Sequence, residues 1–377
     1  MSRHLIFHVI DKLSDAGSTT TGPSQLLYHL VSRGNQQRYA FQVWGLRRDD
    51  VARTALIEQG LPVRCLARHR YDPRVPGDLL RLVRRERPAL LHVHGFAASN
   101  YGRWVGRKVG IPVLIHEHGI NGSIPLYQRL ADRLLSSFPA EAIAVSADVT
   151  SYLTCHRQIP AERVHPIHNG VDVSSFAPAQ PHQADELRRA NAFGERRTVG
   201  IIGRFHSIKG QEDLLRAAVP VSQRLPDALF LFIGDGTNRP ALERLSGTLG
   251  LDDNVRFLGH RGDVAELLKV TDVVVIASHM EAISLALLEA MATGQAVVAT
   301  RVGGNLEVVQ HETSGLLVPP ANSGALAEAI VRLLEDAPLR ARLGQAATRR
   351  IRESFTLEAM VSSVESLYER LINREDA

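Results

Sequence analysis

Short apolar runs alternate along the chain with longer stretches in which apolar residues recur every three or four positions. The runs have the length and the β-branched content of strands, whereas the longer stretches are typical of amphipathic helices. The runs are 5–10, 41–46, 89–95, 113–119 and 142–146 in the first half, and 198–204, 229–236, 255–259, 272–278 and 296–300 in the second. Most lack alternation with polar residues, which indicates parallel strands buried on both faces. The pattern predicts an α/β protein built from strand–helix units.

Helical periodicity lies between the runs and through most of the C-terminal region. Helices are predicted at 78–87, 213–225 and 286–294, and in several pieces over 324–373. The segment 171–186 is rich in Pro, Ala and Gln and has neither period, which makes it the best candidate for a linker. Because 377 residues suffice for two domains, each with its own core, we expect domains at 1–175 and 176–355, followed by a tail at 356–377.

Composition narrows the cellular setting. Hydrophobic residues make up 44% of the chain and charged residues 22%, as in ordinary α/β proteins. The two cysteines, Cys65 and Cys155, predict neither a disulfide framework nor a metal-ligand spacing. The first apolar run has no cleavage site of a signal peptide, and no stretch reaches the roughly 18–20 apolar residues of a spanning helix. We therefore expect a cytoplasmic protein that does not cross a membrane.

Charge is unevenly distributed between the two halves. Residues 1–180 hold 22 Lys/Arg against 14 Asp/Glu, a balance of +8, and residues 181–377 hold 22 against 26, a balance of −4. Two basic helical stretches, 78–87 and 99–110, contribute to the excess, the second with Tyr101 and Trp104. They predict either a peripheral contact with an anionic membrane, on the inner face of the cytoplasmic membrane, or helices packed on a sheet with arginines in water. No recognition motif favours nucleic acid.

The segment 199–215 joins a predicted buried strand to a predicted helix through a loop with two cations. The strand ends at Gly203, the helix begins near Gly210, and Arg204 and Lys209 lie between them. Because the carboxyl end of a parallel strand and the N-terminus of a helix both favour anions, these cations are expected to bind a diphosphate. The segment matches neither the P-loop nor the dinucleotide-binding pattern, and a solvated loop is the alternative.

The segment 278–294 carries two glutamates in an apolar context. Glu281 follows a predicted strand, and Glu289 lies inside a predicted helix whose N-cap is Ser284. A spacing of eight residues on one helix would place both carboxylates on one side, about 12 Å apart, where they suit hydroxyls on two rings of one ligand. A solvated helix face is the ordinary explanation for a lone glutamate. Because Glu289 interrupts an apolar run, however, we expect it to have a partner.

Histidines and one glycine stand where ligands bind in open parallel sheets. The tetrapeptides HVHG at 92–95 and HEHG at 116–119 both end predicted strands. Their histidines are expected to contact substrate or to fill the core; a metal site is the remaining alternative, and the missing carboxylate or thiolate neighbours argue against it. In the early loop 15–27, Gly22 precedes a predicted helix, so its backbone could approach a phosphate or sugar, or form an ordinary turn.

The motifs of the second half follow one another in a recognisable order. They are NGVDxxxF at 169–176, GRxxxxKG at 203–210, GDG at 234–236, VRFLG at 255–259, Glu-x7-Glu at 281–289 followed by AMATG, and GGNLEVV at 303–309. Together they resemble glycosyltransferase family 4, whose members are retaining enzymes. The resemblance is dense over 165–350 and thinner over 1–150. It implies a GT-B fold, with two Rossmann-like parallel-sheet domains facing each other across a deep cleft.

The resemblance also implies roles for domains and residues. The first domain would bind the acceptor and the second the nucleotide sugar, and the tail helix would return to the first. The catalytic candidates are His118, Glu281, Arg204 and Lys209. The donor-binding set is Gly22, Gly203, Arg204, Lys209, Gly234, Arg261, Glu281, Ala282, Ile283, Ser284, Leu285 and Glu289. The two cations would hold the diphosphate, Glu289 the ribose and Glu281 the transferred sugar.

The implied reaction is transfer of a sugar from a nucleotide sugar, with a UDP-sugar favoured, to a glycan or lipid-linked acceptor in cell-surface polysaccharide or glycoconjugate synthesis. No metal and no other cofactor are implied. Departures from the family pattern are Thr21-Gly22-Pro23 in place of paired glycines, Ala282 in place of glycine, and Ser284 and Ala296 in place of proline. The alternatives are a nucleotide-sugar epimerase of the same fold and a donor-binding protein without turnover, while the missing dinucleotide pattern disfavours a dehydrogenase.

Overall fold

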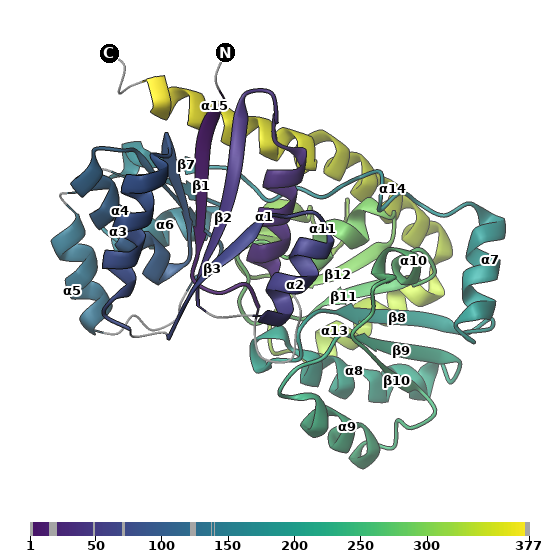
Figure 1. Cartoon of the computed structure of the whole chain (residues 1–377). Helices are drawn as coiled ribbons and strands as arrows, with labels where there is room; N and C mark the ends of the chain where they lie inside the picture. Colours follow the sequence, from purple (N-terminus) through teal and green to yellow (C-terminus); the bar gives the residue numbers. More distant parts are fainter. Residues whose placement is uncertain are drawn as a thin grey trace. The chain divides into compact units, whose positions relative to one another are not determined.

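The computed structural model describes residues 3–14, 21–47, 50–69, 72–120, 126–136, 138 and 140–373. The chain divides into two compact units, each built on one parallel sheet (Figure 1). The first unit comprises Met1–His168 and Glu358–Ala377, and the second comprises Asn169–Leu357. The first unit is therefore assembled from both ends of the chain.

The first unit contains a parallel sheet of seven described strands in the order β3-β2-β1-β4-β5-β6-β7. The strands are β1 (His4–Ile10), β2 (Tyr39–Arg47), β3 (Val63–Arg68), β4 (Leu90–His94), β5 (Val113–Glu117), β6 (Glu141–Ala144) and β7 (Val164–Pro166). The helices are α1 (Gly22–Arg33), α2 (Asp50–Glu58), α3 (Val75–Glu86), α4 (Phe96–Val109), α5 (Leu126–Leu135), α6 (Ala147–Cys155), the 3-10 turn η1 (Ala161–Arg163) and α15 (Leu357–Asn373). The five predicted strands are confirmed. The sequence pattern missed β3 and β7, which lie at the two edges of the sheet.

The second unit contains a parallel sheet of six described strands in the order β10-β9-β8-β11-β12-β13. The strands are β8 (Arg197–Ile202), β9 (Ala228–Ile233), β10 (Val255–Gly259), β11 (Val273–Ile276), β12 (Ala296–Thr300) and β13 (Leu316–Val318). The helices are α7 (Pro181–Ala190), η2 (Ser207–Lys209), α8 (Gln211–Arg224), α9 (Arg239–Thr248), α10 (Val264–Lys269), α11 (Leu285–Ala292), α12 (Asn305–Val308), α13 (Ser323–Glu335) and α14 (Ala337–Ser354). All five predicted strands are again confirmed, and the three-residue β13 was missed.

The sheet of the second unit is buried on both faces, as its apolar strands predict. Alternate residues of β11 belong to different clusters: Val273 and Val275 pack in a core that includes α8 and α13, whereas Val274 and Ile276 pack with α11. The predicted helix at 286–294 corresponds to α11, and the last part of the predicted linker, 181–186, lies in α7.

The two segments that connect the units pair with each other. Val171 donates a backbone hydrogen bond to the Phe355 carbonyl at 3.0 Å and accepts one from the Leu357 amide at 3.0 Å. Gly170 lies against the same segment, since a β-carbon there would stand 2.4 Å from the Thr356 carbonyl oxygen. This turn therefore packs against the point where the C-terminal chain leaves the second unit.

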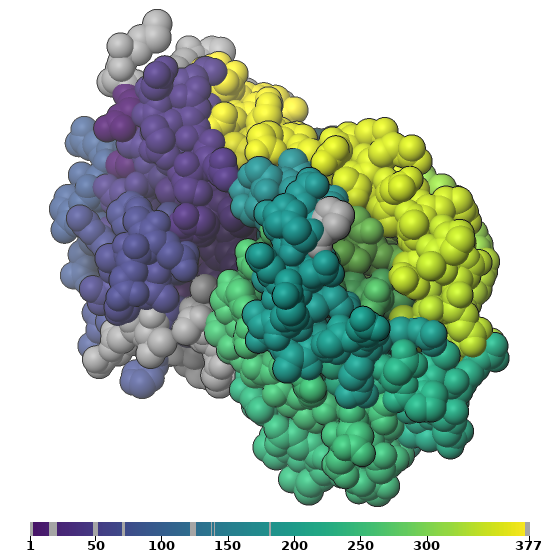
Figure 2. Space-filling model, turned by 90° about the vertical axis from the view of Figure 1, so that its right-hand side faces the viewer, coloured from purple at the N-terminus to yellow at the C-terminus, as the bar shows by residue number. Residues whose placement is uncertain are grey.

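The C-terminal helix α15 completes the first unit. The Tyr368 hydroxyl lies 2.6 Å from Nδ1 of His92 on β4, and Glu365 accepts a hydrogen bond of 2.6 Å from the Asn35 amide. Glu369 forms an ion pair with Arg38. Figure 2 shows the yellow C-terminal chain against the purple N-terminal elements, consistent with these contacts. Within the described residues, no helix is long and apolar enough to cross a membrane.

Candidate active site

The strand order of the second sheet creates a natural ligand position at its carboxyl edge. The chain leaves β8 on one side, towards β9, and β11 lies on the other side of β8. In open parallel sheets, ligands bind beside the carboxyl ends of strands at such a switch point, because the two following loops diverge. The loop after β8 carries Arg204 and Lys209, and the loop after β11 carries Glu281. The topology therefore brings the two motifs found in the sequence to one place.

Lys209 and Glu281 form an ion pair across this switch point. The lysine ammonium contacts Oε1 of Glu281, and the Ser278 hydroxyl donates to the same oxygen at 3.1 Å. The two loops are also joined through the backbone, because the His279 amide donates to the Ile208 carbonyl at 2.8 Å. The pair is mostly shielded from water, with 27% of the Lys209 side chain and 10% of the Glu281 side chain exposed. A cation and an anion are thus held side by side on fixed loops.

Glycines allow the loops after β8 and β9 to approach each other closely. Gly203 and Gly234 follow β8 and β9 with φ values of +140° and +135°, a region that favours glycine. A β-carbon on Gly234 would lie 2.0 Å from the Gly203 carbonyl oxygen. Both predicted donor-site glycines therefore lie at the carboxyl edge of the sheet, where a side chain at Gly234 would force the two loops apart.

The Glu281 loop is braced by Thr300, which the sequence pattern did not single out, and by Gly304 of the GGNLEVV motif. The Thr300 hydroxyl, at the end of β12, donates to the Ser278 carbonyl at 2.5 Å. Gly304 lets its loop approach closely, since a β-carbon there would stand 1.8 Å from the Ala282 carbonyl oxygen. The sequence does show a threonine, Thr300, at the end of a predicted buried strand. Which residue its hydroxyl contacts depends on the order of the strands in the sheet.

Helix α11 begins directly after this loop, and Ser284 is its N-cap as predicted. The Ser284 hydroxyl accepts a hydrogen bond of 3.4 Å from the Leu287 amide. Ala282, Ile283 and Ser284 are buried, and Leu285 is half-buried. The backbone amides of the first turn lie at the positive end of the helix, where an anion is stabilised.

Glu289 lies within α11, whereas Glu281 lies in the loop before it, so the helical separation of about 12 Å expected for the two carboxylates does not apply. The expected partner of Glu289 is also missing: among the described residues, nothing donates a hydrogen bond or forms an ion pair with its carboxylate. Burial raises the pKa of Glu289 to about 7. The Glu289 carboxyl group is therefore half protonated near neutral pH, and its oxygens can accept hydrogen bonds from a ligand.

The two arginines of the predicted site are in different situations. Arg204 is exposed, and its carbonyl accepts a hydrogen bond of 2.9 Å from the Gln211 side chain. The Arg261 guanidinium already forms two hydrogen bonds with Asp263, of 2.7 and 2.6 Å, and a third with Asn191. Arg261 is therefore a paired side chain in this structure, and a ligand would have to compete with a bidentate carboxylate.

In the first unit, the predicted site residues are Gly22 and His118. Gly22 is the exposed first residue of α1, after the N-cap Thr21, whose side chain accepts a hydrogen bond of 3.3 Å from the Ser24 amide. Residues 15–20 of the predicted early loop lie outside the described residues. His118 follows β5 at the carboxyl edge of the sheet. Both residues belong to the edge at which parallel sheets bind ligands.

A chain of imidazoles extends inward from His118. Its Nε2 lies 2.9 Å from Nδ1 of His94, and Nε2 of His94 lies 3.1 Å from Nδ1 of His8. His92 and His116 lie beside this chain, because the parallel register pairs His8 with His92 and His94 with His116. Burial lowers the pKa of His118 and of His8 to about 3. The rings are therefore neutral and exchange N–H···N hydrogen bonds.

Among the residues that the structure describes, the same histidines form the groups that could hold a metal ion. Two groups bring three ring nitrogens within 4.8 Å of one another: His8, His92 and His94, and His94 with His116 and His118. Within these groups the rings are inclined to one another by no more than 38°. Because ring lone pairs lie in the ring planes, nearly parallel rings converge poorly on one ion, and the arrangement suits hydrogen bonding better.

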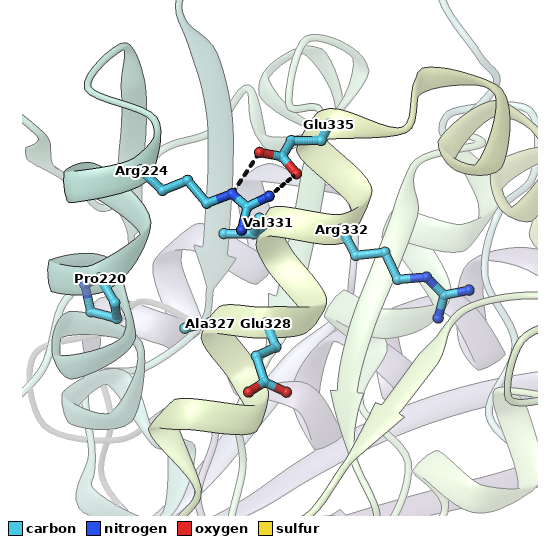
Figure 3. A pocket seen from close by; sticks show the side chains of 7 residues that line it. All are labelled: Pro220, Arg224, Ala327, Glu328, Val331, Arg332 and Glu335. Atoms are coloured by element: carbon cyan, nitrogen blue, oxygen red, sulfur yellow. Dashed lines mark hydrogen bonds and ion pairs between the residues drawn. The ribbon is translucent and has the colours of Figure 1, made fainter.

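A separate hollow lies on the outer surface of the second unit. Its volume is about 450 Å³ and its walls come from α8 and α13. Arg224 and Glu335 point towards each other above it, joined by two hydrogen bonds of 2.7 Å (Figure 3). Arg224 ends α8, whereas Lys209 precedes its start, so the hollow lies about 20 Å along the helix from the ion pair. It is not part of the candidate site.

Two all-parallel Rossmann-like sheets, with a cation and a carboxylate at the switch point of the second, have the architecture of the GT-B fold. The chain belongs to glycosyltransferase family 4: residues 183–350 match the model of glycosyl transferases group 1, and residues 20–175 match the model of glycosyltransferase family 4. The protein is therefore an enzyme that transfers sugars.

Similar proteins span most of the chain. The D-inositol 3-phosphate glycosyltransferase of Salinispora arenicola is 35% identical over 74% of this chain and 68% of its own. The UDP-Gal:alpha-D-GlcNAc-diphosphoundecaprenol alpha-1,3-galactosyltransferase of Escherichia coli is 25% identical over 77% of this chain and 78% of its own. The crystal structure of Anabaena Alr3699/HepE in complex with UDP superposes with a TM-score of 0.86 at 22% identity, covering 97% of this chain and 100% of that one.

Proposed function

We propose that this glycosyltransferase takes its sugar from a nucleotide sugar, preferably a UDP-sugar, and transfers it with retention to a glycan or lipid-linked acceptor. The observation that carries the proposal is the Lys209–Glu281 pair at the switch point of the second sheet. Similar proteins support the donor class, since the name of one specifies UDP-Gal and another was crystallised with UDP. The product would serve cell-surface polysaccharide or glycoconjugate synthesis.

The diphosphate is assigned to the loop between β8 and α8. Arg204 and Lys209 supply two positive charges there, next to the N-terminus of a fourteen-residue helix. As the glycosidic bond to phosphate breaks, negative charge grows on the leaving diphosphate. Fixed cations and amides stabilise that charge more than they stabilise the intact donor, which lowers the barrier. With these cations in place, the chemistry requires no metal ion.

The two glutamates are assigned to the two rings of the donor. Glu289 would accept hydrogen bonds from the ribose hydroxyls, which fills the acceptor positions that no described residue uses. Glu281 would contact the transferred sugar while its pairing with Lys209 and Ser278 holds its orientation. The amides of residues 282–284 would meet the phosphate oxygens or the sugar at the start of α11.

His118 is assigned to the transferred sugar from the first unit, and Gly22 to the phosphates. Because Nε2 of His118 is engaged by His94, its Nδ1 is the atom left to meet a ligand. A neutral imidazole suits this task, since it forms hydrogen bonds without repelling the positive charge that develops on the sugar. Retention would follow a front-face route, in which a phosphate oxygen takes the acceptor proton.

Calorimetric titration with UDP, GDP and ADP tests the donor site directly. We expect one nucleoside diphosphate, UDP, to bind, and Glu289→Ala and Lys209→Met each to weaken binding by about tenfold or more. Glu328→Ala, an exposed glutamate on α13, serves as the matched control. Binding of none of the three nucleotides, or binding unaffected by either site substitution, would contradict the proposal. Donor hydrolysis, followed by product NMR with an acceptor, then tests transfer and retention.

A further inference from the structure

Helix α5 has its polarity reversed relative to an ordinary surface helix. Its apolar side chains are exposed: Leu126 by 71%, Tyr127 by 54%, Leu130 by 53% and Leu134 by 76%. Its buried residues are instead polar, Gln128 and Asp132. Among the described residues, the other exposed large hydrophobic side chains are Ile57 (44%) and Leu306 (53%), which lie elsewhere and singly. Soluble surfaces rarely gather such side chains in one patch without a partner.

The buried side of α5 is held by ion pairs, so the helix cannot turn its apolar side inward. Asp132 is fully buried and accepts hydrogen bonds of 2.9 Å at both oxygens from Nε of Arg157. Arg103 on α4 lies 3.4 Å from the same carboxylate and also donates to the Leu135 carbonyl. Rotating the helix would take the Asp132 carboxylate away from two buried arginines and leave Arg157 with Glu117 as its remaining anion, which is strongly unfavourable. The outward apolar face is therefore a fixed feature of the fold.

Positive charge borders the apolar face. At about 100° per residue, Leu126, Leu130, Leu134 and Tyr127 span an arc of about 100°, and Arg129 and Arg133 lie directly beside it. Both arginines are exposed. The neighbouring α4 adds two more exposed cations, Arg107 and Lys108, and the Arg107 guanidinium lies 4.9 Å above the ring of Phe138, just beyond α5. Within α4 and α5 the acidic residue is Asp132, which is buried. Neither α4 nor α5 carries an exposed acidic residue that would offset these four charges.

The surface continues over the neighbouring helices. Figure 1 shows α3, α4 and α5 together on one side of the first sheet. Arg81, Arg84 and Arg85 of α3 are exposed as well; Arg81 pairs with Asp78 and Arg85 with Glu86, whereas Arg84 has no ion-pair partner among the described residues. The basic stretches 78–87 and 99–110 thus supply charge to this side, while the exposed apolar side chains are on α5. Apolar residues bordered by cations match the headgroup and acyl layers of an anionic bilayer.

We propose that α5 is a membrane-docking helix, with Leu126, Tyr127, Leu130 and Leu134 inserted below the phosphates of an anionic bilayer. Arg129, Arg133, Arg107 and Lys108 then contact lipid phosphates. The docking would bring a lipid-linked acceptor to the first unit, and in this respect it rests on the proposed function. The binding itself requires no turnover and no nucleotide, so it can be tested separately.

The test is cosedimentation of the full chain with vesicles of phosphatidylcholine, alone or mixed with phosphatidylglycerol. We expect binding to the mixed vesicles at low salt and weaker binding as salt rises. Leu130→Ser with Leu134→Ser should reduce partitioning by about tenfold or more, and Arg129→Gln with Arg133→Gln should reduce both binding and its salt dependence. Leu306→Ser, which removes an equally exposed leucine from the second unit, should have no effect.

A second measurement reports insertion itself. When vesicles are added, the tryptophan emission of Tyr127→Trp should shift to the blue. Brominated lipid should quench this emission more than it quenches the emission of the wild type. UDP titration of the leucine variant should match the wild type, so loss of docking and loss of the donor site are distinguishable. Equal vesicle binding by the wild type and the leucine variant would overturn the proposal. So would a wild-type dimer that the leucine variant converts to a monomer, because the face would then bind a second copy.

Discussion

Gly210 lies so close to Ala277 that a β-carbon on Gly210 would stand 2.0 Å from the Ala277 carbonyl oxygen. This contact presses the loop after β8 against the loop after β11, the two loops that carry Lys209 and Glu281. Gly210 also has φ +67° and precedes the first residue of α8. Two separate requirements therefore demand glycine there: backbone conformation and space.

Gly250 allows the two requirements to be separated. It has nearly the same φ, +68°, but an added β-carbon would meet nothing within 4 Å. Gly250→Ala should destabilise the second unit by about 1–2 kcal/mol through conformation alone. Gly210→Ala should cost more in urea unfolding and should also weaken UDP binding at least about tenfold, because the loops must separate. Equal effects of the two substitutions would show that the close approach is unimportant.

The Lys209–Glu281 ion pair predicts opposite effects on donor binding for its two members. Lys209→Met removes a charge that holds the diphosphate, so UDP affinity should fall about tenfold or more. Glu281→Gln leaves the lysine free of its anion, so UDP affinity should be unchanged or higher, while transfer falls by about 10²–10³. Titration calorimetry and a transfer assay measure the two quantities. If Glu281→Gln weakened UDP binding as much as Lys209→Met, the assignment of Glu281 to the sugar would be wrong.

Glu289 should make the second unit less stable as pH rises. Its pKa increases from the ordinary 4.5 to about 7 on folding, so the folded state favours the neutral form. The cost is absent below pH 4.5, grows between pH 4.5 and 7, and amounts to at most about 3 kcal/mol above pH 7. Glu289→Gln should therefore slow hydrogen exchange of α11 at pH 8, show little gain near pH 5, and lose UDP affinity. Glu328→Gln, at an exposed glutamate, should show no such trend.

The buried histidines should make the first unit sensitive to acid. Burial lowers the pKa of His8 and of His118 to about 3 and holds the pKa of His92, His94 and His116 well below 6.5. The unfolded chain then binds more protons than the folded one below pH 6.5, so stability is complete above that pH and falls as acid is added. The protection factors of the β4 and β5 amides, which correct for the slower intrinsic exchange in acid, should fall between pH 6.5 and 5, before those of β11 and β12.

His116 offers a direct check on this explanation. Neither of its ring nitrogens has a hydrogen-bond partner among the described residues. His116→Leu removes one proton-binding group without breaking a hydrogen bond, so it should reduce the acid sensitivity of β4 and β5. If β4 and β5 of His116→Leu were as sensitive to acid as those of the wild type, the sensitivity would have to come from other groups.

The contact between Tyr368 and His92 should contribute measurably to the first unit. Tyr368→Phe would leave Nδ1 of a buried imidazole without its partner at 2.6 Å, which costs about 1–3 kcal/mol. Urea unfolding monitored by hydrogen exchange of β4 measures the loss. Tyr127→Phe, at an exposed tyrosine on α5, is the control that should leave stability within about 0.5 kcal/mol. A similar result for both would mean that water readily replaces the tyrosine hydroxyl.

The sequence predicts the central strands and the loops of the second unit because burial on both faces leaves a continuous apolar run. Edge strands escape this signal: β3 contains Arg64 and Arg68, and β13 has three residues. The position of Ser284 before an apolar helix was enough to predict its role as N-cap. The neighbours of Thr300 and Gly304, in contrast, depend on strand order and loop packing, which no local pattern contains.

The register between distant strands and the orientation of one helix explain the remaining differences between the sequence-based predictions and the structure. His8 joins the other histidines because β1 lies beside β4 in a register that pairs it with His92, and the sequence pattern does not specify that register. In α5, leucines four residues apart would ordinarily predict a face turned to the core. The buried pairing of Asp132 with Arg157 reverses that orientation, and it joins a residue of α5 to one that follows α6.

The return of α15 to the first unit has a consequence for synthesis on the ribosome. His92 and Tyr368 are separated by 276 residues, so the first unit lacks this helix until nearly the whole chain has been translated. The second unit, in contrast, is continuous in sequence and can fold as soon as it emerges. We therefore expect the nascent first unit to keep the face around Tyr39 and His92 uncovered during translation, which makes it the part most dependent on chaperones. A chain truncated before residue 357 should accumulate in that state, with a folded second unit.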